Sequence, residues 1–289
     1  MDEYLLDREL EAACDVARIA WKRIAPYYGG SYQVVEKDNG DGPVTPADHE
    51  ASETIMGELA RRFPGYGLLS EEAKDDFQRL ESERIWVIDP IDGTKEFIRG
   101  KGSFAIQIGL VVATEDGYVP VVGVVYHPTE DRLYGARLGA GTWVEIQGEG
   151  RQSIRVSRTD RPEEMVCIAT RSHRTPSIRR LVNGLMPRKA VSTGSVGIKM
   201  AWIAEGRADY YINDSRGGCK EWDLCAPQIV LTEAGGRVTD FAERPFRYNR
   251  RDVRLYEGIL ASNGACHGEL CRRITELEKI HAENATETR

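Results

Sequence analysis

Motifs for zinc, for thiol redox chemistry and for a phosphate-binding P-loop are missing from this 289-residue sequence. The six cysteines include no C-x-x-C pair, and the five histidines form no H-E-x-x-H. No G-x-x-x-x-G-K-[ST] occurs either. These absences argue against a zinc site and against a P-loop nucleotide switch. The dispersed cysteines are expected to be reduced thiols.

Long apolar runs and an excess of basic residues are also missing. The most apolar stretches, residues 104–113 and 119–126, contain Gln, Gly or Pro and are shorter than the roughly 20 residues that span a membrane. The first residues are acidic and do not resemble the start of an export signal. The net charge of −7 disfavours a nucleic-acid polymer as partner. We expect a cytoplasmic protein that acts on a small molecule and has no membrane partner.

The segment Trp-Val-Ile-Asp-Pro-Ile-Asp-Gly-Thr-Lys-Glu-Phe, residues 86–97, is the most informative part of the chain. Residues 85–88 are apolar and mostly β-branched, which predicts a buried strand. Pro90 cannot donate a hydrogen bond to a neighbouring strand, so we expect the strand to end there. Asp89 and Asp92 would lie at this end, and Gly93 would let backbone N–H groups approach an anion. Because carboxylates and phosphate repel each other, the pattern predicts a divalent cation between them.

Further acids complete a set of oxygen ligands. Glu71 follows a short apolar stretch, and Asp223 precedes an expected helix. With Asp89, Asp92 and the backbone carbonyl of Ile91, they suit Mg²⁺, which binds a few carboxylates, water and substrate phosphate. Two such ions can activate a water molecule and hold both oxygens of an in-line displacement.

Each acid has a simpler interpretation when it is taken alone. Asp89 or Glu71 can be a solvated turn residue, and Asp223 can cap a helix. Proline is tolerated only in the first turn of a helix, so Pro227 predicts that Asp223 lies at or just before a helix start. Capping and metal binding are compatible, and the joint pattern is what favours a metal site.

Apolar periodicity and turn residues divide the chain into helices and strands. The predicted helices are residues 3–27, 46–63, 176–185, 195–205, 225–233 and 269–281. The predicted strands are residues 67–69, 85–88, 104–112, 119–126, 132–137, 165–169, 190–191, 208–212 and 236–240. A polar segment, residues 37–43, is expected to be a mobile loop. Strands dominate the first half and alternate with helices in the second. We therefore predict an α+β sub-domain, residues 1–155, with most metal ligands and an α/β sub-domain, residues 156–289, with substrate contacts and Asp223.

Several motifs together resemble the inositol monophosphatase superfamily of Mg²⁺-dependent, lithium-sensitive phosphatases. They are Asp-Pro-Ile-Asp-Gly-Thr at 89–94, Glu-Glu at 71–72, Trp-Asp at 222–223 and Glu-Ala-Gly-Gly at 233–236. Others are similar to its 3′(2′),5′-bisphosphate nucleotidase branch, which includes the bacterial CysQ type. These are Thr-Lys-Glu-Phe at 94–97, Gly-Ser-Val-Gly-Ile-Lys at 194–199 and Gly-Cys-Lys-Glu-Trp-Asp at 218–223. The resemblance implies the α-β-α-β-α sandwich shared by inositol monophosphatases and fructose-1,6-bisphosphatases.

The resemblance also implies roles for individual residues. Asp48 and Thr94 would orient and deprotonate the attacking water. Two or three Mg²⁺ ions would bind, and Li⁺ would inhibit. The implied metal ligands are Glu71, Asp89, the Ile91 carbonyl, Asp92 and Asp223. The implied substrate contacts are Gly93, Thr94, His173, Ser195, Lys199 and Asp223.

The residues alone leave plainer alternatives for the positions outside the acid set. Asp48 can simply place negative charge at a helix start. Ser195 and Lys199 lie one turn apart, so they can face one ligand or be a helix cap and a solvated lysine. His173 follows a strand in a polar loop, where a lone histidine is often structural.

The implied reaction is hydrolysis of the 3′-phosphate of adenosine 3′,5′-bisphosphate to AMP and phosphate, a step of sulfur metabolism, by a monomer or homodimer. A phosphatase for inositol, fructose or histidinol phosphates in the same superfamily is the alternative. A catalytically silent nucleotide-binding protein is a second one, and the presence of Asp48 and Thr94 argues against it. Asp-x-x-Asp is one residue longer than the Asp-x-Asp of haloacid dehalogenase phosphatases, which argues against that mechanism.

Overall fold

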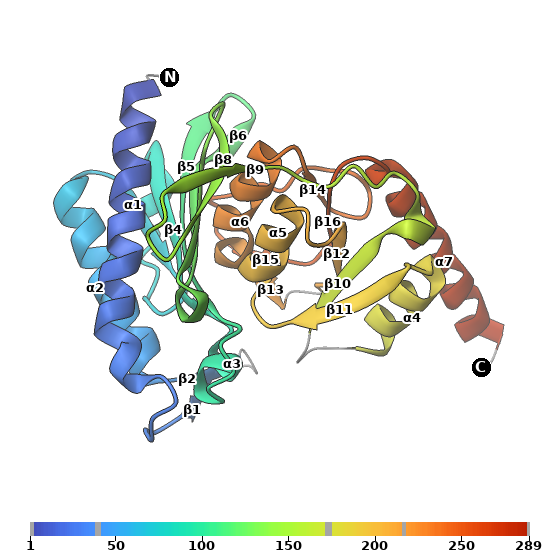
Figure 1. The fold of residues 1–289 in the computed structure, drawn as a ribbon, viewed down its shortest axis with the longest axis horizontal. Coiled ribbons are helices and arrows are strands. Elements are labelled where there is room, and N and C mark those ends of the chain that lie inside the picture. Colours follow the sequence, from blue (N-terminus) through green and yellow to red (C-terminus); the bar gives the residue numbers. More distant parts are fainter. Residues whose placement is uncertain (1–2, 38–41, 171–174, 216–217, 288–289) are drawn as a thin grey trace.

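Two large mixed sheets alternate with three layers of helices across the molecule (Figure 1). The structure is a computed structural model that describes residues 3–37, 42–170, 175–215 and 218–287. Its α-helices are α1 (Glu3–Ile24), α2 (Pro46–Arg62), α3 (Thr94–Ile98), α4 (Pro176–Leu185), α5 (Val196–Ala204), α6 (Glu221–Glu233) and α7 (His267–Glu287). This order of layers confirms the predicted α-β-α-β-α sandwich.

The larger sheet has seven strands that follow one another in sequence order. They are β3 (Gly67–Ser70), β4 (Arg84–Asp92), β5 (Ala105–Thr114), β6 (Gly117–His127), β7 (Arg132–Arg137), β8 (Gly141–Ile146) and β9 (Arg151–Ile154). β3 is parallel to β4, and every later pair is antiparallel. The parallel pair matters for the site, because it brings the carboxyl ends of β3 and β4 to the same edge.

The smaller sheet has five strands in the order β11-β10-β12-β16-β14. They are β10 (Val166–Thr170), β11 (Lys189–Thr193), β12 (Tyr210–Asn213), β14 (Arg237–Thr239) and β16 (Ile259–Ser262). The contacts of β10 with β11 and β12 are parallel, whereas β16 runs antiparallel to β12 and β14. Two short pairs, β1 (Val35–Glu36) with β2 (Pro43–Val44) and β13 (Cys219–Lys220) with β15 (Arg254–Leu255), lie outside both sheets.

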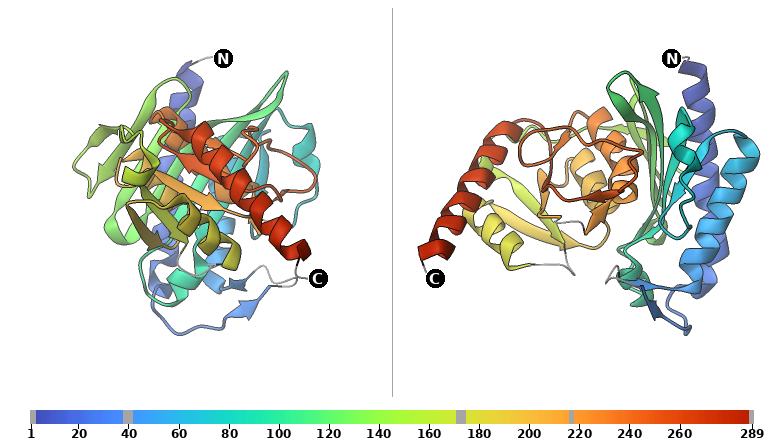
Figure 2. Two further views of the ribbon diagram at one scale, coloured as in Figure 1. Left: turned by 90° about the vertical axis from the view of Figure 1, so that its right-hand side faces the viewer. Right: turned by 180° about the vertical axis from the view of Figure 1, so that it is seen from behind.

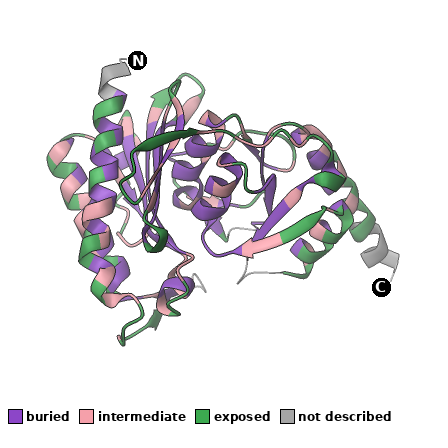
Figure 3. Cartoon of the chain, in the orientation of Figure 1, coloured by how far each residue is buried: buried purple, intermediate pink, exposed green. Residues whose placement is uncertain are grey.

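Apolar clusters between the sheets and helices hold the layers together. α1 and α2 cover one face of the seven-stranded sheet, and α5 and α6 fill the space between the two sheets. α4 and α7 cover the outer face of the five-stranded sheet, as the views in Figure 2 show. Buried residues concentrate on the central strands and on the two middle helices (Figure 3). The middle helices are therefore fixed from both sides, and both begin at the site described below.

Most predicted elements are present, with differences at their ends. The pattern of apolar residues did not predict β9 or β16. The expected loop at residues 37–43 is bordered by the β1–β2 pair, and residues 38–41 lie outside the described part. α6 packs against β5 and β6 although it comes after residue 155, so the division into two sub-domains stays a prediction. None of the helices, within the described ranges, has the length and apolar composition needed to cross a bilayer.

Candidate active site

Asp89 and Asp92 lie at a bulge in β4. The expectation that this strand ends at Pro90 was wrong, because β4 continues to Asp92. Its pairing with β5 shifts register between Asp89 and Asp92, and it resumes at Asp92 opposite Ala105. Pro90 falls inside this irregular stretch, where its missing N–H breaks no regular ladder bond. The bulge holds both carboxylates in the protein interior, at 1% and 7% exposure.

Three carboxylates form a compact cluster. Within the described ranges, Asp89, Asp92 and Asp223 each offer an oxygen within 4.8 Å of the other two. Burial raises the pKa of Asp89 and of Asp223 well above the usual range, and the nearby Glu71 charge adds to both effects. A buried group of like charges is stable only with a cation or with added protons. This donor set therefore fits Mg²⁺, as the sequence predicted.

Protein donors fix the orientation of Asp92. Its Oδ2 accepts hydrogen bonds from Gln107 Nε2 at 2.7 Å, Ser195 Oγ at 2.6 Å and the Gly197 N–H at 2.7 Å. All three fall on Oδ2, and none of these bonds uses Oδ1. Gln107 was missed at the sequence level. The one feature of the sequence that could have indicated it is that Gln107 is polar within an otherwise apolar strand. In the structure its side chain is buried.

Asp223 lies within the first turn of α6. The prediction that this helix starts at Cys225 was wrong, because α6 begins at Glu221 and Pro227 lies inside it. Asp223 Oδ2 accepts a hydrogen bond from the Lys220 N–H at 2.6 Å, and this contact caps the start of the helix. Pro227 has no N–H to donate to the Asp223 carbonyl, so α6 lacks that backbone hydrogen bond. Asp223 thus caps α6 and also belongs to the acid cluster.

Glu71 follows β3 and lines the same cavity as the cluster. Its Oε1 accepts a hydrogen bond from Lys37 Nζ at 2.7 Å, and Lys37 also contacts the Glu72 carboxylate. Burial opposes the charge of the Lys37 amine, but the two carboxylates raise its pKa overall. Burial and the Glu71 charge raise the pKa of Glu72 to about 7. Lys37 was not predicted, since it lay in a segment expected to be a mobile loop.

Asp48 and Thr94 are in hydrogen-bonding contact. The Thr94 hydroxyl lies 3.1 Å from Asp48 Oδ1 and 3.2 Å from the Ile91 carbonyl oxygen. The other Asp48 oxygen accepts from the Thr45 N–H at 2.8 Å and from the Thr45 hydroxyl at 2.6 Å. Asp48 therefore caps α2 and also contacts Thr94, so its position at the helix start is compatible with the catalytic role that stays a prediction. Burial raises the pKa of Asp48, which these hydrogen bonds counteract.

Gly93 makes the turn from β4 into the short helix α3. Its φ of +104° is in the region that favours glycine. A Cβ there would also lie 3.1 Å from the Ser103 carbonyl oxygen. Gly93 and Thr94 both line the cavity, next to the carboxylate cluster.

Ser195 and Lys199 belong to the start of α5. Ser195 Oγ accepts from the Ile198 N–H at 3.0 Å and donates to Asp92, so its hydroxyl is held by protein partners. Lys199 is 2% exposed, and its Nζ donates to the Ser195 carbonyl at 2.9 Å. The alternative of a solvated lysine was wrong. Burial lowers the pKa of Lys199, while the Asp92 charge counteracts this effect.

One cavity of about 370 Å³ joins these groups. The predicted residues that line it are Glu71, Asp89, Ile91, Asp92, Gly93, Thr94, Ser195, Lys199 and Asp223. Asp48 does not line the cavity itself, but it contacts Thr94, which does. Tyr211 and Asn213, which the sequence did not single out, form part of its wall. His173 lies outside the described residues.

Comparisons with known proteins agree with this site. A profile of the inositol monophosphatase family matches residues 5–279. The chain is 34% identical over 256 residues to the 3′(2′),5′-bisphosphate nucleotidase CysQ of Escherichia coli strain K12, covering 88% of this chain and 99% of that protein. It is 33% identical over 245 residues to human inositol monophosphatase 2, covering 81% of each chain.

A solved structure agrees as well. The fold matches CysQ from Bacteroides thetaiotaomicron with a TM-score of 0.74 and 30% identity, over 90% of this chain and 98% of that one. Sequence, fold and the position of the acid cluster point to the same conclusion. The chain belongs to the inositol monophosphatase family of phosphatases.

Proposed function

We propose that this phosphatase removes the 3′-phosphate of adenosine 3′,5′-bisphosphate, giving AMP and phosphate, with Mg²⁺ required. The observation that carries the proposal is Lys199, a buried lysine in the wall of the cavity that also holds the acid cluster. A substrate with a second phosphate needs a cation away from the metal cluster. Sequence identity alone does not choose the substrate, because the nucleotidase and the inositol phosphatase match almost equally well.

The metal would be held by the carboxylates of Glu71, Asp89, Asp92 and Asp223 and by the Ile91 carbonyl. Bound Mg²⁺ would supply Lewis acidity toward the phosphate and lower the pKa of a coordinated water. The fit rests on the clustered oxygens and on the raised pKa values that burial gives to the acids.

The Asp48–Thr94 pair would act on the attacking water. Asp48 Oδ1 receives the Thr94 hydroxyl hydrogen, which turns a lone pair of the Thr94 oxygen toward the water. As the water oxygen bonds to phosphorus, its proton passes to Thr94, and the Thr94 proton passes to Asp48. The bond from phosphorus to the ribose 3′-oxygen breaks, and that oxygen leaves with a proton from solvent.

Substrate contacts would come from both sides of the cavity. The N–H groups of Gly93 and Thr94 would hold the 3′-phosphate, since they line the cavity beside the cluster. Lys199 and Ser195 at the start of α5 would face the AMP portion together with His173. Lys199 brings the charge, and we assign it to the 5′-phosphate.

A substrate panel tests the proposal. Phosphate release by the purified protein would be measured with adenosine 3′,5′-bisphosphate, its 5′-phosphosulfate relative, inositol 1-phosphate, fructose 1,6-bisphosphate and histidinol phosphate, each with and without lithium. We expect the highest kcat/KM for the two nucleotides, loss of activity with a chelator and inhibition by lithium. A clear preference for inositol phosphate would refute the nucleotidase assignment. Tight nucleotide binding without phosphate release would indicate a silent binding protein.

A further inference from the structure

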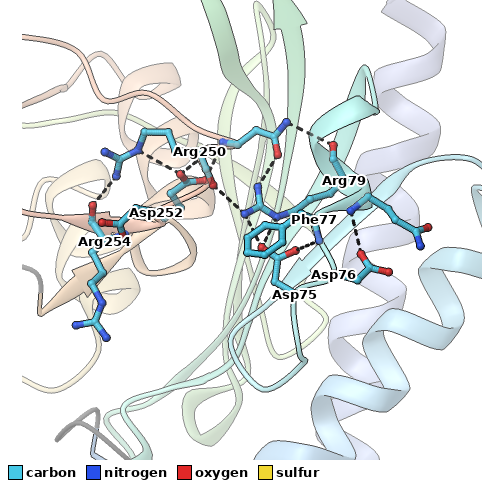
Figure 4. A network of polar contacts seen from close by, with 10 residues as sticks. Asp75, Asp76, Phe77, Arg79, Arg250, Asp252 and Arg254 are labelled. Carbon is cyan, nitrogen blue, oxygen red and sulfur yellow. Dashed lines mark hydrogen bonds and ion pairs between the residues drawn. The ribbon is translucent and has the colours of Figure 1, made fainter.

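Arg79 is a buried arginine outside the cavity that connects two distant parts of the chain (Figure 4). It lies in the 3-10 helix η3 (Gln78–Glu81), shortly after β3 and Glu71. Its Nε and Nη2 donate to Asp75 Oδ2 at 3.0 and 2.7 Å. Its Nη1 donates to Asn249 Oδ1 at 2.6 Å, and Nη2 also donates to the Arg250 carbonyl at 2.8 Å. The guanidinium thus ties the segment after β3 to a loop 170 residues later.

Glu221 binds the same loop from the side of α6. It is the first residue of α6 and has no exposed surface. Its two oxygens accept from the Asn249 N–H at 2.8 Å and the Arg250 N–H at 3.0 Å, and Arg250 Nε lies 3.3 Å away. The Glu221 N–H donates to the Val253 carbonyl at 3.0 Å. A buried carboxylate with this many donors is costly to disturb, so the start of α6 is fixed to the loop.

The connected contacts therefore link two elements that carry acids of the site. One end is the segment after β3, which begins at Glu71, and the other is the first turn of α6, which carries Asp223 two residues after Glu221. The Asp223 carboxylate enters the cluster from this turn alone, because its neighbours in the cluster belong to β4. A small rotation of the helix start would move Asp223 relative to Asp89 and Asp92.

We propose that Arg79 and Glu221 are positioning residues for the metal site, which act by holding the first turn of α6 so that Asp223 meets the β4 carboxylates. Neither side chain lines the cavity. The inference rests on the proposed function only in taking Mg²⁺ as the cation. Contacts that support metal ligands from outside commonly change metal affinity 10- to 100-fold when they are removed.

Arg79→Met and Glu221→Gln test this role, with Arg132→Met as the matched control. Arg132 forms an ion pair with Glu205 that also joins the two halves of the chain, but at the far end of α5. Mg²⁺ binding would be measured by isothermal titration calorimetry without substrate, and Tm and circular dichroism would be recorded for every variant. The Mg²⁺ concentration for half-maximal activity would be compared with kcat at saturating Mg²⁺.

We expect Arg79→Met and Glu221→Gln to bind Mg²⁺ at least 10-fold more weakly, with a larger effect on the half-maximal Mg²⁺ concentration than on kcat. Arg132→Met should keep its Mg²⁺ affinity within 2-fold even where its Tm falls as far. Equal weakening in the control, or wild-type affinity in both test variants, would overturn the proposal. If Arg79→Met does not fold, Asn249→Ala removes one acceptor of Arg79 without leaving a charge unpaired, and the same criteria apply.

The two proposals can fail separately. A wild-type protein that binds Mg²⁺ but does not hydrolyse bisphosphate nucleotides would refute the proposed substrate only. Variants that keep wild-type Mg²⁺ affinity would refute the positioning role only.

Discussion

Replacing Lys199 by methionine tests the proposed substrate most directly. Methionine has nearly the same length as lysine but no charge, so the wall of the cavity keeps its shape. Burial disfavours the charged form of Lys199, and a neutral side chain there removes a buried charge. Asp92 loses a nearby cation but keeps its three hydrogen-bond donors. We therefore expect Lys199→Met to fold with a Tm close to that of the wild type.

The size of the effect follows from the chemistry of the lost contact. A hydrogen bond to a charged group contributes about 1.5–3 kcal/mol. Because each 1.36 kcal/mol of transition-state binding changes the rate about tenfold, the loss corresponds to about 10- to 100-fold in kcat/KM. The whole loss should depend on the 5′-phosphate, since the 3′-phosphate lies at the acid cluster in our proposal. For a nucleotide without the 5′-phosphate, the substitution should lower kcat/KM only slightly.

The assay compares two substrates that differ only in that group. We expect Lys199→Met to lower kcat/KM for adenosine 3′,5′-bisphosphate 10- to 100-fold more than for adenosine 3′-monophosphate. Lys101→Met, a change of an exposed lysine beyond α3, should leave the ratio of the two substrates unchanged. Equal losses for both substrates would refute the assignment of Lys199 to the 5′-phosphate. They would indicate that the lysine acts only through Asp92.

Two further predictions concern the acid cluster and the fold. Asp89→Asn should abolish turnover and retain the far-UV circular dichroism spectrum, because the amide keeps the shape of the carboxylate but not its charge; unchanged phosphate release would remove Asp89 from the site. Burial lowers the pKa of His267 to about 4, between Ser262 and Thr239, so the folded state resists protonation and its stability falls as the pH drops from about 6.5 to 4. Between pH 7 and pH 4.5 the wild type should lose about 2.5 kcal/mol more of its free energy of unfolding than His267→Gln does, as measured by urea unfolding. Equal losses in the two proteins would contradict this account.

The site was predicted best from the sequence where its residues belong to one short motif. β4 with Asp89 and Asp92 could be read from a strand followed by paired acids, and the contact between Asp48 and Thr94 followed from the family resemblance. Contacts between distant residues could not be read in this way. Lys37 with Glu71, and Arg79 with Asn249, join segments that no periodicity links, because only the closed fold makes them neighbours.

The two boundary errors at the acid cluster involved a proline. Pro90 was expected to end β4, but a bulge accommodates it and both acids stay in the strand. Pro227 was expected in the first turn of α6, but the helix begins earlier, at Glu221, after a lysine N-cap of a residue type that caps helices poorly. Asp223 compensates by accepting the Lys220 N–H. At both positions an acid of the cluster lies next to a residue that is unfavourable in its strand or helix. Such exceptions to local preference are expected at functional sites.

The donors around the cluster suggest how the chain stabilises three carboxylates so close together. Asp92 and Asp223 each direct one oxygen to backbone N–H groups at the start of a buried helix, Gly197 in α5 and Lys220 before α6. Negative charge is stabilised at such positions by the helix dipole. Both helices are packed between the two sheets, which holds these donors in place. The geometry of the acid cluster is thus set by the packing of α5 and α6, and we expect metal affinity to respond to changes at these helix starts as well as to changes in the acids themselves.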